Sequence, residues 1–168
     1  MRETDWRAAR SAEGTLVARP GFSARARART GLGQTLISGD LEAAVGTLAP
    51  GAPFVGLYGL APEGAHALRI ARLKALLVTP APIVAGDGWR DSWCATTVDD
   101  GFVVVEVEGT DAGLVLMQGT AADLAAGSPS AALMFAGQRC LLARTGGGFR
   151  LHVERPRLEA LLAWLDGA

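Results

Sequence analysis

The chain has 168 residues, of which 49% are hydrophobic, with a mean hydropathy of +0.25 and a formal net charge of −1. This length favours one domain or two small fused halves, and it suffices for a hydrophobic core without disulfides or a structural metal. The apolar content excludes an intrinsically disordered chain, and the balanced charge excludes a general attraction to nucleic acid or to anionic membranes.

The first twenty residues (1–20) are predicted to form an N-terminal arm, in which the large apolar residues are Trp6, Leu16 and Val17. The start of the chain is charged and has no apolar stretch behind it, unlike a signal peptide. The longest apolar runs, Leu114–Met117 and Ala131–Ala136, are far shorter than the about 20 residues of a membrane span. We therefore expect a cytoplasmic protein without a membrane partner.

Residues 22–29 alternate an apolar set, Phe22, Ala24, Ala26 and Ala28, with a polar set, Ser23, Arg25, Arg27 and Arg29. A period of two predicts a strand with one apolar and one cationic face. The cationic face is interpreted first as a solvated strand face, and second as a site for an anion or a partner.

The rest of the first half is predicted as a strand, a short helix capped by Asp40, and three further strands. Their expected ranges are Gln34–Ile37, Leu41–Leu48 (the helix), Phe54–Leu60, Ala67–Leu73 and Ala75–Val78. Two prolines and two glycines within residues 79–88 then mark an internal boundary.

The second half repeats this order. A hairpin of strands Trp93–Val98 and Phe102–Val107 turns at Asp99-Asp100-Gly101, and a helix through Leu116 follows with Thr110 as its N-cap. A helical turn, two strands and a final helix with a leucine stripe are expected next, at residues 121–126, 138–144, 149–154 and 156–165. The predicted fold is α+β, a single domain over residues 21–168 with two pseudo-repeated halves, about 21–85 and 90–168, of antiparallel strands with short helices.

No catalytic, cofactor-binding or metal-ligating residue is predicted. His66 and His152 have no second His or Cys at metal spacing, and no Gly-x-Ser-x-Gly nucleophile turn is present. His152 is expected on an outward strand face with Arg150 and Glu154, and Glu106 and Glu108 are likewise expected on a solvated face. Cys94 and Cys140 are interpreted as reduced, buried thiols. Trp89 and Trp93 are expected in a loop that forms a contact surface.

The stretch from Trp93 to the end resembles the gamma subunit of heterotetrameric sarcosine oxidase. The resemblance is carried by five segments: Phe102–Met117, Gly119–Leu124, Phe135–Cys140, Leu141–Glu154 and Arg155–Leu165. The first half agrees with that family in element order and in Leu73–Pro80, although Lys74-Ala75 stands where the family often has an acidic residue and tryptophan.

This resemblance implies the fold of the folate-binding domain of glycine-cleavage aminomethyltransferase. It implies a non-catalytic structural subunit that assembles with alpha and beta subunits of an enzyme that oxidatively demethylates sarcosine or a related N-methyl amino acid. FAD, FMN, NAD and tetrahydrofolate would then be bound by the other subunits and no cofactor by this chain. The alternative is a freestanding folate-binding protein of the same fold; a bare interaction module is the third hypothesis.

The apolar excess has to be buried in a core or against a partner. We expect part of it on the surface as a patch, at the helix around Leu114–Met117, at Ala131–Phe135 or on the N-terminal arm. The isolated chain is for the same reason expected to be able to self-associate.

Overall fold

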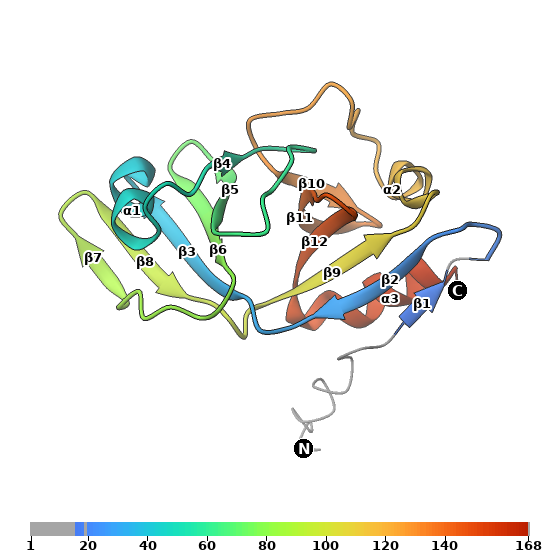
Figure 1. The fold of residues 1–168 in the computed structure, drawn as a ribbon, viewed down its shortest axis with the longest axis horizontal. Coiled ribbons are helices and arrows are strands. Elements are labelled where there is room, and N and C mark those ends of the chain that lie inside the picture. Colours follow the sequence, from blue (N-terminus) through green and yellow to red (C-terminus); the bar gives the residue numbers. More distant parts are fainter. Residues whose placement is uncertain (1–15, 19, 168) are drawn as a thin grey trace, which may run out of the picture.

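The computed structural model describes residues 16–18 and 20–167. These residues form twelve strands and three α-helices. They are arranged in two sheet-based halves joined side by side (Figure 1). In chain order the elements are β1 (Leu16–Ala18), β2 (Arg25–Arg29), β3 (Gly33–Gly39), α1 (Leu41–Leu48), β4 (Phe54–Val55), β5 (His66–Ala71), β6 (Lys74–Thr79), β7 (Gly88–Arg90), β8 (Trp93–Thr97), β9 (Phe102–Glu108), α2 (Ala112–Gly119), β10 (Ala132–Phe135), β11 (Gln138–Arg144), β12 (Gly148–Glu154), a 3₁₀ turn (Arg155–Arg157) and α3 (Leu158–Asp166).

The strands form two six-stranded sheets with the same internal plan. The first sheet has the order β1-β2-β9-β12-β11-β10, and the second has the order β4-β5-β6-β3-β8-β7. In each sheet one strand, β3 or β9, leads into a short helix and is followed by three strands of its own half. All neighbours pair antiparallel except the short β4, which is parallel to β5. The predicted α+β class with repeated antiparallel halves is confirmed.

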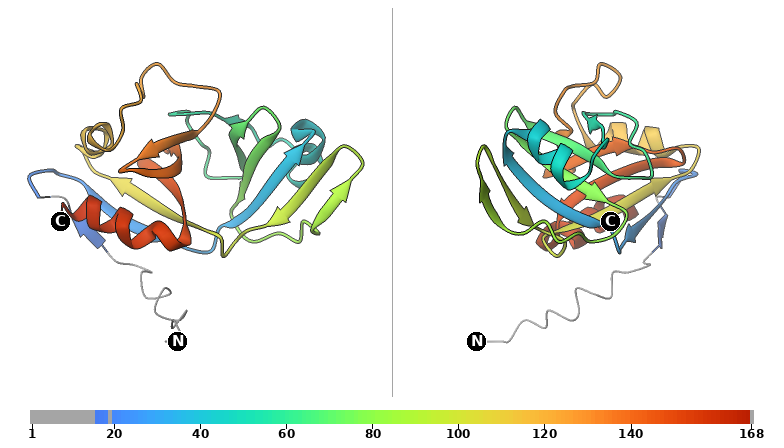
Figure 2. Two further views of the ribbon diagram at one scale, coloured as in Figure 1. Left: turned by 180° about the vertical axis from the view of Figure 1, so that it is seen from behind. Right: turned by 60° about the vertical axis from the view of Figure 1, so that its left-hand side comes forward.

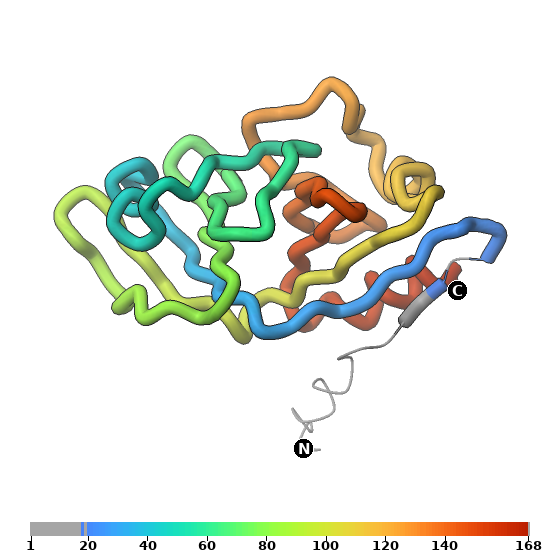
Figure 3. The backbone as a smooth tube through the Cα atoms, in the orientation of Figure 1, coloured from blue at the N-terminus to red at the C-terminus, as the bar shows by residue number. Residues whose placement is uncertain are grey.

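The two halves exchange their first strands. The hairpin of β1 and β2 precedes β3 in the sequence but joins the first sheet, where β2 pairs with β9. The hairpin of β7 and β8 precedes β9 but joins the second sheet, where β8 pairs with β3. Figure 3 shows the two connections, residues 30–32 and 98–101, passing close together at the junction between the sheets. The backbone N–H of Val98 donates to the carbonyl of Gln34 there, at 2.8 Å. The predicted stretches 21–85 and 90–168 therefore do not each form a sheet of their own.

Three apolar clusters lie in successive layers. Helices α2 and α3 cover the outer face of the first sheet, and α1 covers the outer face of the second (Figure 2). A third cluster lies between the sheets and takes Val104 and Leu141 from the first and Leu68 and Leu76 from the second. Both faces of the central strands are consequently buried.

Most predicted elements are present, and three predictions are wrong. Strand β4 ends at Val55 because the backbone N–H of Leu57 donates instead to the carbonyl of Ser128, at 2.9 Å. Residues 121–126 form turns and no helix, because Asp123 bonds the nearby backbone N–H of Ala125. The residue at the start of α2 is Asp111 rather than Thr110, and its carboxylate accepts from the backbone N–H of Ser23 at 2.8 Å.

Asp40 caps α1 as predicted, since its Oδ1 accepts from the backbone N–H of Ala43 at 3.1 Å. Replacing Asp40 by alanine is expected to lower the free energy of unfolding by about 1 kcal/mol, because an N-terminal donor of the helix loses its partner. Urea unfolding checks this. Asp40→Asn is the matched control and should retain most of the stability, since asparagine also caps helices; equal losses in both variants would contradict the capping role.

Candidate functional site

The central strand β12 places polar side chains in the layer between the sheets. Arg150 is 3% exposed and His152 is fully buried, so the predicted outward face is wrong for both. Phe149, Leu151 and Val153 do pack on the opposite side, against α2 and α3. The alternation of β12 was therefore correct, but the second sheet covers the face that the sequence alone assigned to water.

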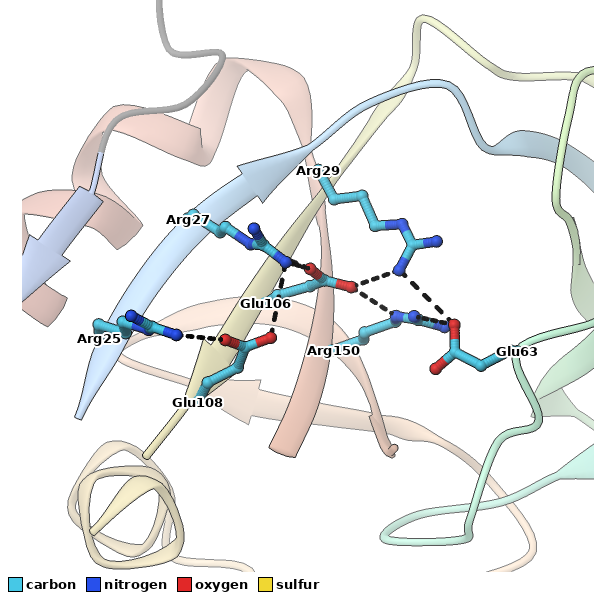
Figure 4. Close-up of polar contacts among 7 residues, drawn as sticks. All are labelled: Arg25, Arg27, Arg29, Glu63, Glu106, Glu108 and Arg150. Atoms are coloured by element: carbon cyan, nitrogen blue, oxygen red, sulfur yellow. Dashed lines mark hydrogen bonds and ion pairs between the residues drawn. The ribbon is translucent and has the colours of Figure 1, made fainter. Parts of the chain in front are cut away.

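Glu106 is the hub of a network of ion pairs (Figure 4). It lies on β9 between β2 and β12, directly opposite Arg27 on one side and Arg150 on the other. Its carboxylate accepts from three arginines: Arg29 Nη1 at 2.6 Å, Arg27 Nη2 at 3.0 Å and Arg150 Nε at 3.0 Å. Glu106 is itself buried, which corrects the prediction that it lies on a solvated face.

Glu63 extends the network from the other half. It lies in the connection between β4 and β5, and its carboxylate accepts from Arg150 Nη2 at 2.9 Å. Arg29 Nη1 lies 3.8 Å from the same oxygen. Arg150 therefore joins a carboxylate of the first sheet to a carboxylate of a loop that belongs to the second sheet (Figure 4).

The arginines set the charge state of both carboxylates. The hydrogen bond and the charge of Arg150 lower the pKa of Glu63. Burial alone would raise the pKa of Glu106, but the hydrogen bonds from Arg29 and Arg150 outweigh burial and lower it. Both groups are thus held as carboxylates, an arrangement that suits ion pairing and not proton transfer.

The cationic face of β2 is neither a freely solvated face nor an open anion site. Arg25 lies 3.4 Å and Arg27 3.6 Å from Glu108 on the neighbouring strand β9, in addition to the bond of Arg27 to Glu106. The side chains of Arg25 and Arg27 are 63% and 54% exposed, whereas Arg29 is 33% exposed. The solvent exposure of the network therefore decreases from Arg25 at the surface to Arg150 in the interior.

Two histidines and a glutamine continue the polar layer inward. His152 Nδ1 lies 3.0 Å from Gln34 Oε1, and Gln34 Nε2 donates to the carbonyl of Phe102 at 3.0 Å. His66 Nδ1 lies 2.9 Å from the carbonyl of Gly64. Burial is the largest cause that lowers the pKa of His152 to about 3, and the positive charge of Arg150 adds to it. Burial also lowers the pKa of His66. Both imidazoles are neutral at pH 7.

The sequence predicted no catalytic, cofactor-binding or metal-ligating residue, so there is no predicted site residue to place in this layer. Within residues 16–18 and 20–167, no group of three or more His, Cys, Asp or Glu side chains is placed to hold a metal ion. The arrangement joins the two halves of the fold through buried charge pairs and hydrogen bonds. It offers no activated nucleophile and no pair of groups with opposed acid and base roles.

Cys140 is buried as predicted, whereas Cys94 is half-buried. Burial raises the pKa of the Cys140 thiol to about 12, so its reactive thiolate is scarce near neutral pH. A soluble disulfide reagent at pH 8 is expected to leave Cys140 unmodified in the folded chain and to modify it once urea unfolds the protein. Peptide mass mapping checks this; rapid native labelling of Cys140 would contradict its assigned burial.

The expected contact surfaces are exposed in part. On α2, Leu114 and Met117 are 50% and 57% exposed, while Val115 and Leu116 are buried. On β10 only Met134 is exposed among the large apolar residues, at 57%. Residues 1–15 of the predicted arm, Trp6 included, lie outside the described residues, and residues 16–18 form β1.

The two tryptophans of the predicted contact loop differ. Trp89, on the edge strand β7, is 74% exposed. Trp93 is buried beneath α1, and the guanidinium of Arg90 stacks over its ring at 4.9 Å from the ring centre. Of the two tryptophans, only Trp89 is therefore available for the predicted contact surface. No described helix is long and apolar enough to cross a membrane.

No protein-family model matches the sequence, and no curated protein matches it. A solved structure of heterotetrameric sarcosine oxidase from Corynebacterium sp. U-96, in complex with pyrrole 2-carboxylate, does match in three dimensions. The superposition has a TM-score of 0.72 at 20% sequence identity, and it covers 99% of this chain and 93% of that chain. The two chains share one fold. The resemblance to sarcosine oxidase predicted from the sequence is thereby confirmed as a likeness of fold over the whole chain.

Proposed function

We propose that this chain is the gamma-type structural subunit of a heterotetrameric sarcosine oxidase-type complex, and that it has no active site of its own. The observation that carries the proposal is the whole-chain match, because nearly all of this chain corresponds to nearly all of one chain of such an oxidase.

The polar centre supports a structural role. Its carboxylates, Glu63 and Glu106, are occupied by arginines of the same chain, and its histidines are buried and neutral. Buried charge pairs of this kind favour one defined arrangement of neighbouring elements and are poorly suited to bind a substrate. We therefore place the chemistry of the complex, the oxidative demethylation of sarcosine or a related N-methyl amino acid, on other subunits.

Alpha and beta subunits are the proposed partners in the cytoplasm. FAD, FMN, NAD and tetrahydrofolate are proposed to bind those subunits. We propose that the exposed side chains of Leu114 and Met117 on α2 form part of the contact with these subunits. Burying exposed apolar side chains against a partner is favourable, because it removes them from water.

The surface of α2 gives a mutational test of the proposed assembly. Replacing Leu114 and Met117 together by aspartate is expected to reduce co-purification of the oxidase subunits at least tenfold and to leave the thermal midpoint almost unchanged, because both side chains are already exposed. Val84→Asp is the matched control, since Val84 is fully exposed and lies far from α2 in the sequence. Unchanged co-purification of the α2 variant would remove this helix from the interface.

Tetrahydrofolate separates the proposal from the alternative, a freestanding folate-binding protein. Calorimetric titration of the isolated chain with tetrahydrofolate is expected to show no saturable binding at micromolar concentrations. Saturable binding of tetrahydrofolate by the chain alone would favour the alternative.

A further inference from the structure

Strand β7 forms a free edge of the second sheet. It is the last strand in the order β4-β5-β6-β3-β8-β7, and β8 is its neighbour among the described strands. Figure 1 shows β7 at the outer end of the molecule with no described element beyond it. A free edge presents backbone N–H and C=O groups without strand partners, and these groups can bond an extended segment of another chain.

The hairpin geometry directs both backbone groups of Trp89 towards this edge. The turn between β7 and β8 has two residues, and the positive φ of Asp91, 44°, fits such a turn. Arg90 and Trp93 close the turn and therefore form a hydrogen-bonded pair. Bonded and non-bonded pairs alternate along antiparallel strands, so Trp89 and Cys94 form a non-bonded pair. The N–H and C=O of Trp89 consequently point away from β8.

The side chain of Trp89 lies on the open face of the sheet beside this edge. Trp89 and its partner Cys94 share one face, and neighbouring Trp93 is on the other face, where it is buried beneath α1. Helix α1 therefore does not cover Trp89, which is 74% exposed. Tryptophan is among the residues that contribute most to binding at protein interfaces.

Two exposed carboxylates flank Trp89. Asp87 and Asp91 lie two positions before and after it, and neither forms an ion pair with any residue that the structure describes. Asp87 Oδ1 accepts from the backbone N–H of Thr97 at 2.8 Å, a bond that leaves its negative charge without a cation. The guanidinium of Arg90 lies over the ring of Trp93. The edge around Trp89 is therefore acidic.

The acidic edge disfavours a second copy of this chain as the partner. Antiparallel pairing of two β7 strands about Trp89 would place Asp87 of each copy opposite Asp91 of the other. Like charges directly opposite each other destabilise a strand pair, whereas opposite charges stabilise it. A strand with basic residues at these two positions is thus the better partner.

We propose that the edge of β7 is a docking site for an extended segment of a partner chain, which adds a strand to the second sheet. The segment has a central apolar residue and a basic residue two positions away on each side. The central residue exchanges backbone hydrogen bonds with Trp89 and packs beside its indole, and the basic residues lie opposite Asp87 and Asp91. This site is separate from the α2 surface, which lies towards the other end of the molecule (Figure 1), and it does not depend on the proposed function.

A peptide titration of the full chain, followed by NMR, tests the proposal. The probe is the end-blocked peptide Thr-Lys-Thr-Val-Thr-Lys-Thr, and it is expected to shift the backbone and indole N–H signals of Trp89 in the millimolar range. One control peptide carries an N-methylated valine and lacks the central donor, and another has glutamate in place of both lysines. Both controls are expected to bind more weakly. Absence of shifts at β7, or equal shifts with all three peptides, would overturn the proposal.

Variants of the chain test the chemistry of the partner with the same probe. Asp87→Asn combined with Asp91→Asn keeps an acceptor for Thr97 and a residue that tolerates positive φ, but it removes both charges. It is expected to weaken binding of the lysine peptide by about threefold or more, the effect of losing two exposed ion pairs. Asp166→Asn, on α3 in the other half, is the matched control and should bind as the unmodified chain does. Unchanged binding by the double variant would overturn the proposed basic partner.

Discussion

Replacing Glu106 by glutamine is expected to lower the free energy of unfolding by about 3–5 kcal/mol, the range for breaking a buried ion pair by removing one partner. Glu106 is buried and accepts from three arginines at 2.6–3.0 Å. Glutamine keeps the size of the side chain but removes its charge. Arg150, 3% exposed, would then face two other guanidinium groups and retain only the exposed Glu63 as a carboxylate partner.

Glu108→Gln is the matched control for this change. Glu108 lies two residues further along β9 on the same face, pairs with Arg25 and Arg27, and its side chain is 30% exposed. Solvent-exposed ion pairs contribute about 0–1 kcal/mol, so this variant should lose little stability. Urea unfolding of both variants at pH 7 measures the difference. Similar small losses in both would show that the interior network does not hold the halves together.

Acidification below about pH 6.5 is expected to destabilise the chain through its buried histidines. The pKa of His152 is lowered to about 3 by burial, whereas an unfolded histidine titrates near 6.5. The folded state binds fewer protons than the unfolded state between these values. The contribution of His152 is therefore complete above pH 6.5 and is lost as the pH falls, at up to about 1.4 kcal/mol per pH unit.

Other groups of the polar layer act in the same direction. The pKa of His66 is also lowered by burial, which adds to the loss below its ordinary value. The pKa values of Glu63 and Glu106 are lowered as well, so their contributions are present above the ordinary carboxylate range and are lost on further acidification. The histidines thus account for the loss at pH 5–6, and the two carboxylates add to it on further acidification.

Urea unfolding at several pH values between 7.5 and 4.5 measures this dependence. The free energy of unfolding is expected to fall steadily below pH 6.5. In His152→Gln the slope should be shallower, because one titrating group is gone whatever the absolute stability of the variant. A flat profile from pH 7 to pH 5 would contradict the neutral, buried state of His152.

Local patterns in the sequence were sufficient to predict most helices and strands and the repeated plan of the two halves. The alternation in β2, the cap at Asp40 and the Asp-Gly turn before β9 each depend on neighbouring residues, so they can be predicted locally. The exchange of strands between halves could not be predicted in this way. It depends on which distant strand β2 pairs with, and the alternation within β2 does not specify that strand.

The polar centre was missed for a related reason. Arg150 and His152 alternate with apolar residues in the pattern of a half-exposed strand, and only the second sheet shows that their face is buried. One signal was present. Three arginines on β2 and two glutamates on β9 have the same period of two, and antiparallel pairing of the two strands would neutralise both faces. That complementarity favours pairing across the halves over a solvated cationic face.

The central claim is that this chain is a subunit of a sarcosine oxidase-type complex, and the native mass of its assembly tests it most directly. The tagged full-length chain would be co-expressed with the other oxidase subunits of its source, purified by its tag and weighed by native mass spectrometry. The account predicts one species that contains this chain in stoichiometric amount together with the other subunits and that oxidises sarcosine or a related N-methyl amino acid. It is contradicted if the tagged chain is recovered alone while the remaining subunits assemble and turn over substrate without it.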